Sequence, residues 1–138
     1  MKAILDTGPW VALIDKSESR HKDCVMWFKS FEGVLYSTEA VLTEVLYLLN
    51  FSTKAQKAAL DFVVESIVEI VPADIESIKK IKPLIQKYSD LPMDYADATI
   101  VCLASETGIR NVVTFDKKDF NIYRLQKTKP FIIYPIFP

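Results

Sequence analysis

The sequence predicts an α/β fold, a three-layer α/β/α sandwich with a central, mostly parallel sheet. Short apolar strands alternate with amphipathic helices along the chain, which is the pattern of a sheet covered by helices on both faces. The strands expected at 2–6 and 111–116 both end on an aspartate. The chain has 138 residues, half of them hydrophobic, and no repeat, linker or low-complexity segment is visible. We therefore expect one domain spanning residues 1–138.

The first half of the chain contains three of the expected strands. Pro9 suits the first position of a helix, Ser37 and Thr38 can cap the helix that follows them, and Thr53 with Gln56 matches a capping box. The predicted strands are 2–6, 34–38 and 68–71, and the predicted helices are 7–16, 21–31, 39–50 and 52–66.

The second half of the chain continues the alternation. Helices are predicted at 74–88 and 94–107, and strands at 111–116 and 131–135. Pro83 should kink or split the first of these helices, because proline lacks the N–H that an α-helix uses. Gly108 is expected just past the end of the second helix.

Composition limits the classes of function. The 17 basic and 18 acidic residues give a net charge of −1, whereas a protein that coats nucleic acid without specificity is more basic. An enzyme that contacts a few phosphates through metal ions need not be basic. Two cysteines and one histidine disfavour a zinc site and a disulfide framework, and fit a reducing cytoplasm. No apolar run reaches the roughly 18 residues of a membrane span, and the N-terminus does not resemble a signal peptide.

Asp6 and Asp116 follow predicted parallel strands, so both should lie at the carboxyl edge of the sheet, where open α/β sheets bind ligands. Glu44 lies within about 60° of Val41 and Leu48 on a helical wheel and should point inward. Its neighbour Glu39 lies roughly 140° from Glu44 and should be solvated.

Two aspartates open the helix predicted at 94–107. Asp94 suits an N-cap position. Asp97 lies within about 60° of Ile100, Val101 and Ala104, so it shares the apolar face of the helix. A capping role explains Asp94 more readily than it explains Asp97.

Four carboxylates from separate segments would therefore gather and repel one another unless a cation neutralised them. Oxygen ligands of this kind suit Mg²⁺ or Mn²⁺. Each acid also has a purely structural reading: Asp6 and Asp119 can form turns or caps, and Glu44 can extend to solvent. The predicted metal ligands are Asp6, Glu44, Asp97 and Asp116.

Four segments occur in the order expected of a PIN domain, and together they cover the chain to about residue 123. They read "ILDTGPWVALID", "STEAVLTEVLYLL", "LPMDYADATIVCLASETG" and "VVTFDKKDF". The pattern resembles the small single-domain PIN ribonucleases of VapC type, which are the toxins of prokaryotic toxin–antitoxin pairs. Two features depart from the family pattern or leave it ambiguous. Gly8 stands where the family often has serine, and both Asp94 and Asp97 are candidates for the third acid, of which Asp97 fits the register.

The resemblance implies a divalent-metal-dependent endoribonuclease that cleaves single-stranded or loop RNA in the cytoplasm. Its ligand set would be the same four acids, which act as the catalytic residues. The Thr7 hydroxyl, beside the first of them, would orient water or a scissile oxygen of the substrate. The resemblance also implies a small antitoxin partner and a homodimer. Lys117 and Lys118 are candidates for contacts with phosphates of the substrate, and their alternative is a role as solvated surface charges. Asp94 and Asp119 would hydrogen-bond to the site without binding the metal directly.

Several residues near these segments have a structural reading that we prefer. Trp10 and Tyr95 are expected to pack in the core and not to stack on a base, and His21 is expected at the surface. A receiver-like phosphoacceptor domain would need adjacent acids after its first strand and a lysine that ends a late strand, and the sequence offers neither. A PIN-like domain that binds or processes RNA without a toxin role stays open as the main alternative.

Overall fold

The computed structural model describes residues 1–135. Its central sheet has the strand order β3-β2-β1-β4-β7, and every neighbouring pair is parallel. The sheet strands are β1 (Lys2–Leu5), β2 (Val34–Ser37), β3 (Val68–Ile70), β4 (Asn111–Val113) and β7 (Ile132–Tyr134). The predicted parallel sheet is thus confirmed, and all five of its strands were expected from the sequence.

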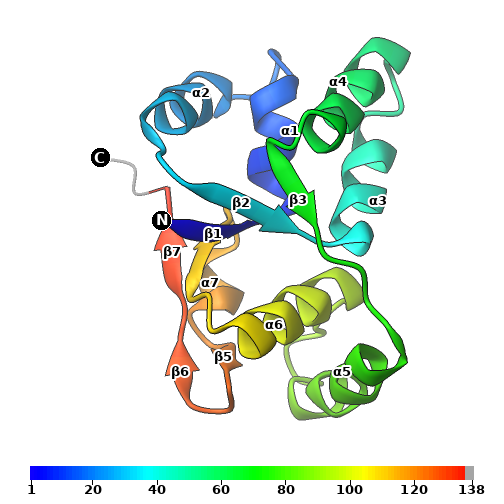
Figure 1. The fold of residues 1–138 in the computed structure, drawn as a ribbon, viewed down its shortest axis with the longest axis vertical. Coiled ribbons are helices and arrows are strands. Elements are labelled where there is room, and N and C mark those ends of the chain that lie inside the picture. The colour runs from blue at the N-terminus through cyan, green and yellow to red at the C-terminus, as the bar shows by residue number, and fades with distance from the viewer. Residues whose placement is uncertain (136–138) are drawn as a thin grey trace.

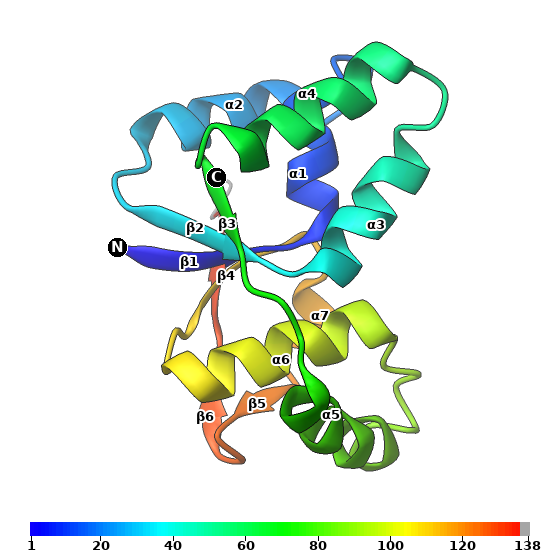
Figure 2. The same ribbon diagram turned by 45° about the vertical axis from the view of Figure 1, so that its right-hand side comes forward.

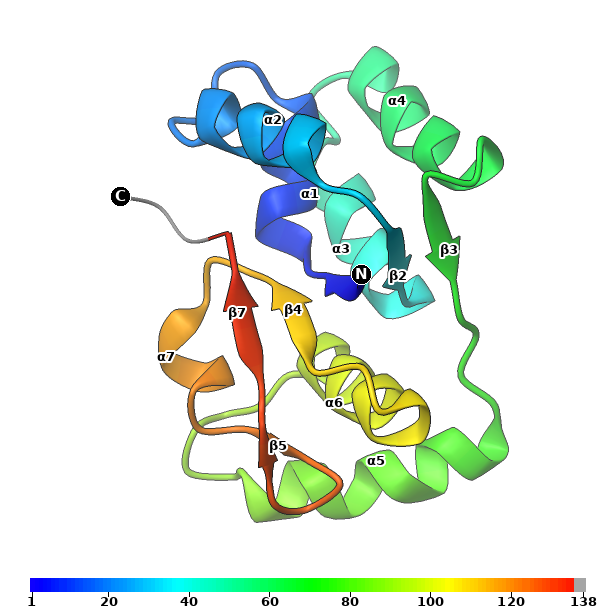
Figure 3. The same cartoon turned by 60° about the vertical axis from the view of Figure 1, so that its left-hand side comes forward.

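Helices cover both faces of this sheet, as the three-layer prediction requires (Figures 1 and 2). One layer contains α1 (Thr7–Ile14), α2 (His21–Ser30), α3 (Glu39–Leu48) and α4 (Thr53–Val64). The other contains α5 (Ile75–Lys87), α6 (Tyr95–Thr107) and the short α7 (Lys117–Phe120). A small antiparallel pair, β5 (Arg124–Leu125) and β6 (Lys129–Pro130), leads into the edge strand β7 (Figure 3).

The chain changes direction across the sheet at β1. It first adds β2 and β3 on one side of β1, and then adds β4 and β7 on the other side. The carboxyl ends of β1 and β4 therefore flank the topological switch point, where ligands bind in open α/β sheets. Asp6 follows β1 and Asp116 lies three residues beyond β4, so the topology brings both acids to this crevice.

The core lies between the sheet and the two helical layers. Trp10 is fully buried and stacks against Phe62 with 6.4 Å between ring centroids, which confirms the expected core role of Trp10. On the other face, Tyr123 and Phe120 are fully buried and meet edge to face at 5.1 Å. These large side chains hold α1 and α7 against the sheet, and both helices begin at a site aspartate.

Local details at two helices narrow the sequence prediction or differ from it. The helix α5 runs through Pro83 without a split, which was one of the two expected outcomes. Pro83 is exposed, so solvent can hydrate the helical carbonyl that loses its donor. The N-cap of α4 is Ser52. The expected capping box between Thr53 and Gln56 does not form, because the Gln56 side-chain amide donates to the Leu46 carbonyl instead.

Two further differences concern the helix starts in the first half. Pro9 is the third residue of α1 and not the first, since the helix begins at Thr7. Thr38 caps α3, whereas the Ser37 hydroxyl donates to the Leu5 carbonyl on the neighbouring strand. Gly108 ends α6 in the left-handed conformation with φ 77°, as expected.

Within residues 1–135 we find no helix that is both long enough and apolar enough to span a membrane.

Candidate metal centre

Asp6 forms the floor of the crevice between β1 and β4. It is buried, and as the N-cap of α1 it accepts the Thr7 N–H at 2.8 Å. Its other carboxylate oxygen accepts the Thr114 hydroxyl at 2.7 Å. The Asp6 N–H also donates to the Val113 carbonyl, so both strands fix this residue.

Glu44 reaches the same region from α3. Its Oε2 accepts the Thr7 hydroxyl at 2.8 Å, across 37 residues of sequence. The side chain is half-buried, as its inward place on the helical wheel predicted, and Glu39 is exposed, as expected. The Thr7 hydroxyl therefore orients Glu44, which is a more specific task than the contact with water or substrate that the sequence suggested.

Asp94 and Asp97 divide their tasks at the start of α6. Asp94 is the exposed N-cap, and its Oδ1 accepts the Asp97 N–H at 2.8 Å. Asp97 is half-buried, and its Oδ2 accepts the hydroxyl of the buried Tyr123 at 3.1 Å. The capping role of Asp94 is confirmed, and the Asp97 carboxylate is fixed by a hydrogen bond from a buried side chain.

Asp116 and Asp119 repeat this arrangement at α7. Asp116 is the N-cap, and its Oδ1 accepts the Asp119 N–H at 3.2 Å. Carboxylate oxygens of Asp97, Asp116 and Asp119 lie within 4.8 Å of one another, close enough for one cation to bridge them. Sequence reasoning gave Asp119 only a supporting role. The repeated spacing of "DYAD" and "DKKD" is the signal that could have placed it in the cluster.

The carboxylates act on one another's pKa. Burial raises the pKa of Asp6 to about 6, and the Glu44 and Asp94 charges add to this shift. Burial and the charges of Asp94 and Asp6 raise the pKa of Asp97 to about 8. The pKa of Asp116 is raised too, chiefly by burial and against the lowering effect of the Asp119 N–H. The crevice therefore favours protons or cations.

The structure thus brings the predicted acids together in two connected parts. Asp97 and Asp116 form the tight cluster with Asp119. Asp6 and Glu44 interact with each other at the crevice floor, and the charge of Asp6 also acts on Asp97. Lys117 and Lys118 are exposed on α7, directly after Asp116.

Three residues near these acids, Gly8, His21 and Tyr95, have surroundings that the sequence did not reveal. A Cβ at Gly8 would lie 2.8 Å from the Phe115 ring, so the serine usual at this position in the family would need that ring to move. The Nδ1 atom of His21 lies 2.7 Å from the Ala12 carbonyl oxygen, so its ring ties α2 to α1. Tyr95 is 45% exposed, and the prediction that it packs in the core is wrong.

The fold and the site define an α/β protein whose parallel sheet carries a carboxylate-lined crevice at its switch point. The chain belongs to the PIN domain family, whose model matches residues 3–125.

Individual relatives agree with that assignment. Ribonuclease VapC26 of Mycobacterium tuberculosis is 26% identical over 123 residues, which cover 88% of this chain and 91% of the relative. The crystal structure of M. tuberculosis VapC20, a sarcin-ricin loop cleaving toxin, has a TM-score of 0.77 at 22% identity and covers 84% of this chain and 91% of its own. The structure of VapBC2 from Rickettsia felis, bound to a DNA fragment from its promoter, has a TM-score of 0.67 at 17% identity. The match covers 98% of this chain and all of the other.

Tyr123→Phe tests whether the Asp97 carboxylate depends on its hydrogen bond. Removing the hydroxyl frees Asp97 Oδ2, while the buried ring still packs against Phe120. We expect the affinity for Mn²⁺ to fall about 10- to 100-fold, the usual effect of losing a partner behind a metal ligand. Calorimetric titration with Mn²⁺ measures it. Unchanged affinity in a folded variant would mean that the bond has no part in metal binding.

Proposed function

We propose that this chain is a divalent-metal-dependent endoribonuclease that cleaves single-stranded or loop RNA, and that it acts as the toxin of a toxin–antitoxin pair. The observation that carries the proposal is the convergence of acids from four separate segments at the switch point of a PIN domain. The relative VapC26 is named a ribonuclease, and the structural neighbour VapC20 is described as a sarcin-ricin loop cleaving toxin.

The donor set fits Mg²⁺ or Mn²⁺, because every candidate ligand offers a carboxylate oxygen. We assign the ligands as Asp6, Glu44, Asp97 and Asp116. Asp119 is within reach of the same ion, since its carboxylate lies in the tight cluster. When bound, a divalent ion lowers the pKa of water and offsets the charge that develops on a phosphate under attack.

The chain's own residues prepare this site. Thr7 and Thr114 each donate a hydroxyl hydrogen bond to a crevice carboxylate, which fixes the direction of its lone pairs. Lys117 and Lys118 are exposed at the rim and are assigned to phosphates that flank the scissile bond. A single strand can lay its backbone across this rim with its bases splayed out, which a duplex cannot do.

The test is cleavage of a fluorescent single-stranded RNA by purified protein with Mn²⁺, with Mg²⁺ and with EDTA. We expect cleavage with either ion, none with EDTA, and recovery when Mn²⁺ is restored. RNA binding without turnover under all three conditions would favour the alternative, a PIN-like RNA-binding domain.

We also expect an antitoxin segment that covers the crevice with a basic side chain, most favourably arginine. A guanidinium binds carboxylates in a bidentate manner and would compete with the metal ion. Leu48 and Phe51 follow Glu44 at helical spacing and are 51% and 65% exposed, so apolar residues of the same segment have a surface to cover.

If a short reading frame next to the gene encodes this partner, coexpression should yield a complex that cleaves RNA at least about tenfold more slowly than the free chain. Its inhibition should be relieved when the basic residue of the partner is replaced by alanine. A saturated complex with full nuclease activity would overturn this prediction.

The oligomeric state and the place of action are further parts of the proposal. Trp27, Phe28 and Phe31 are half-buried against the core, but Leu48 and Phe51 are exposed. We propose a homodimer that covers part of the exposed apolar surface and acts on RNA in the cytoplasm. Light scattering of the purified chain measures the dimer.

A further inference from the structure

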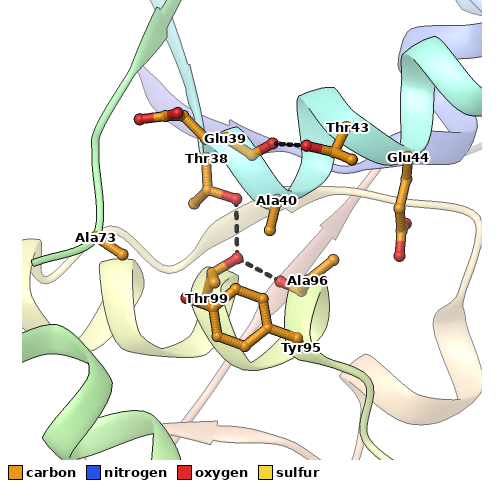
Figure 4. A pocket seen from close by; sticks show the side chains of 9 residues that line it. All are labelled: Thr38, Glu39, Ala40, Thr43, Glu44, Ala73, Tyr95, Ala96 and Thr99. Atoms are coloured by element: carbon orange, nitrogen blue, oxygen red, sulfur yellow. Dashed lines mark hydrogen bonds between the residues drawn. The ribbon is translucent and has the colours of Figure 1, made fainter.

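A cavity of about 440 Å³ lies beside the acidic crevice, between the first turns of α3 and α6 (Figure 4). Glu44 belongs to the crevice and also lines this cavity, and its side chain points into the gap between the two helices. The cavity thus adjoins the proposed metal site through Glu44. Its lining residues are Thr38, Glu39, Ala40, Thr43, Glu44, Ala73, Tyr95, Ala96 and Thr99.

The hydroxyl protons of the three threonines in the lining are already used inside the protein. Thr99 donates to the Ala96 carbonyl at 2.6 Å, so Thr38 is the donor in the 2.8 Å bond between the Thr38 and Thr99 hydroxyls. The Thr43 hydroxyl donates to the Glu39 carbonyl.

Among the described residues 1–135, no lysine or arginine lines the cavity. What remains to a ligand is the carboxylates of Glu39 and Glu44 and the hydroxyl of Tyr95. With two carboxylates and no cation in the lining, the cavity suits a group that donates hydrogen bonds and does not suit a phosphate.

Tyr95 supplies a flat surface at the mouth of this cavity. It is the first residue of α6 and is 45% exposed, so one side of its ring is open to a ligand. Nucleobases stack on such rings with little dependence on their identity. A base stacked on Tyr95 would share the cavity with Glu44, which also belongs to the acidic crevice.

We propose that this cavity binds a guanine base of the RNA strand next to the cleaved phosphate. The inference rests on the proposed nuclease function. Guanine is the base whose Watson–Crick edge presents two adjacent donors, N1–H and the N2 amino group, which match the two oxygens of one carboxylate. In uracil the single donor is flanked by carbonyl oxygens, which a carboxylate repels.

The carboxylate assigned to this edge is that of Glu39. It lines the cavity, is exposed and is free to turn over a bound base. Glu44 already accepts the Thr7 hydroxyl and belongs to the metal site. Tyr95 therefore provides stacking energy for any base, and Glu39 provides the preference for guanine.

The test is binding of labelled hexaribonucleotides, measured by fluorescence anisotropy in EDTA so that a metal-dependent enzyme leaves them intact. One RNA is hexauridylate, and three others carry a single guanine, adenine or cytosine at the third position. We expect the guanine RNA to bind at least about tenfold more tightly than hexauridylate.

Three variants locate the effect. Tyr95→Ala should weaken binding of the guanine RNA about tenfold or more, and Tyr95→Phe should retain it. Glu39→Gln should weaken binding of the guanine RNA. Because it also removes a carboxylate that repels uracil, hexauridylate should bind at least as tightly as before, so the preference for guanine is lost. Tyr47→Ala is the matched control, because Tyr47 is a 72% exposed tyrosine on α3 that does not line the cavity.

Equal binding of the four RNAs, or equal effects of Tyr95→Ala and Tyr47→Ala, would overturn the inference. Cleavage assays with Mn²⁺ separate it from the proposed function. Metal-dependent cleavage without a preference for guanine would remove the base site and leave the nuclease. Guanine-selective binding without cleavage would support the base site and contradict the nuclease function.

Discussion

Asp97→Asn is expected to abolish metal-dependent RNA cleavage and to leave the metal-free fold intact. The amide keeps the size of the side chain and can still accept the Tyr123 hydroxyl, but it loses the charge that holds a cation. Because the charges of Asp94 and Asp6 oppose ionisation of Asp97, the variant should be as stable as the parent without metal, or slightly more stable at pH 8. Cleavage rates with Mn²⁺ and melting curves in EDTA measure both effects.

Asp94 is the matched control, since it lies one helical turn before Asp97 and carries the same group. Asp94→Asn should keep much of the activity, because asparagine caps a helix about as well as aspartate. Asp94→Ala should cost about 1 kcal/mol of stability, the usual loss of a cap. A dead Asp94→Asn beside an active Asp97→Asn would mean that ligand and cap are assigned the wrong way round. Full activity in both variants would mean that neither aspartate at the start of α6 binds the metal ion.

The sequence was sufficient to predict the sheet and the meeting of its acids. Strands that end on Asp6 and close to Asp116 must bring those residues to one edge if the strands are parallel, and the inward place of Glu44 follows from helical periodicity. These inferences needed only spacing. The division between Asp94 as cap and Asp97 as inward acid followed in the same way, because N-cap chemistry and helical phase are both local.

What could not be predicted depends on contacts between distant segments. Tyr123 supports Asp97 across 26 residues, and Thr7 donates to Glu44 across 37. Neither pairing has a sequence spacing that would reveal it. Tyr95 was expected in the core because aromatic residues usually pack there. Its exposure follows from the cavity between α3 and α6, which arises only when the two layers meet at the edge of the sheet.

The metal-free protein is expected to lose stability as the pH rises, and Mn²⁺ is expected to restore it. Asp6 and Asp97 have pKa values of about 6 and about 8 in the folded protein, both above the ordinary 3.8 of the unfolded chain. Between these limits the native state holds more protons than the unfolded state, so stability falls as the pH rises through about 6 and then about 8. Melting temperatures in EDTA should therefore be lower at pH 8 than at pH 5.

Millimolar Mn²⁺ should raise the melting temperature at pH 8 by several degrees, because a ligand that binds only the native state stabilises it. An ion at tenfold excess over its dissociation constant contributes about 1.4 kcal/mol, which is about 5 °C for a chain of 138 residues. The shift should shrink at pH 5, where protons on Asp6 and Asp97 compete with the ion. Asp97→Asn should lose most of the shift and part of the pH dependence. Equal shifts at pH 5 and pH 8, or no shift at pH 8, would contradict a carboxylate metal centre in this crevice.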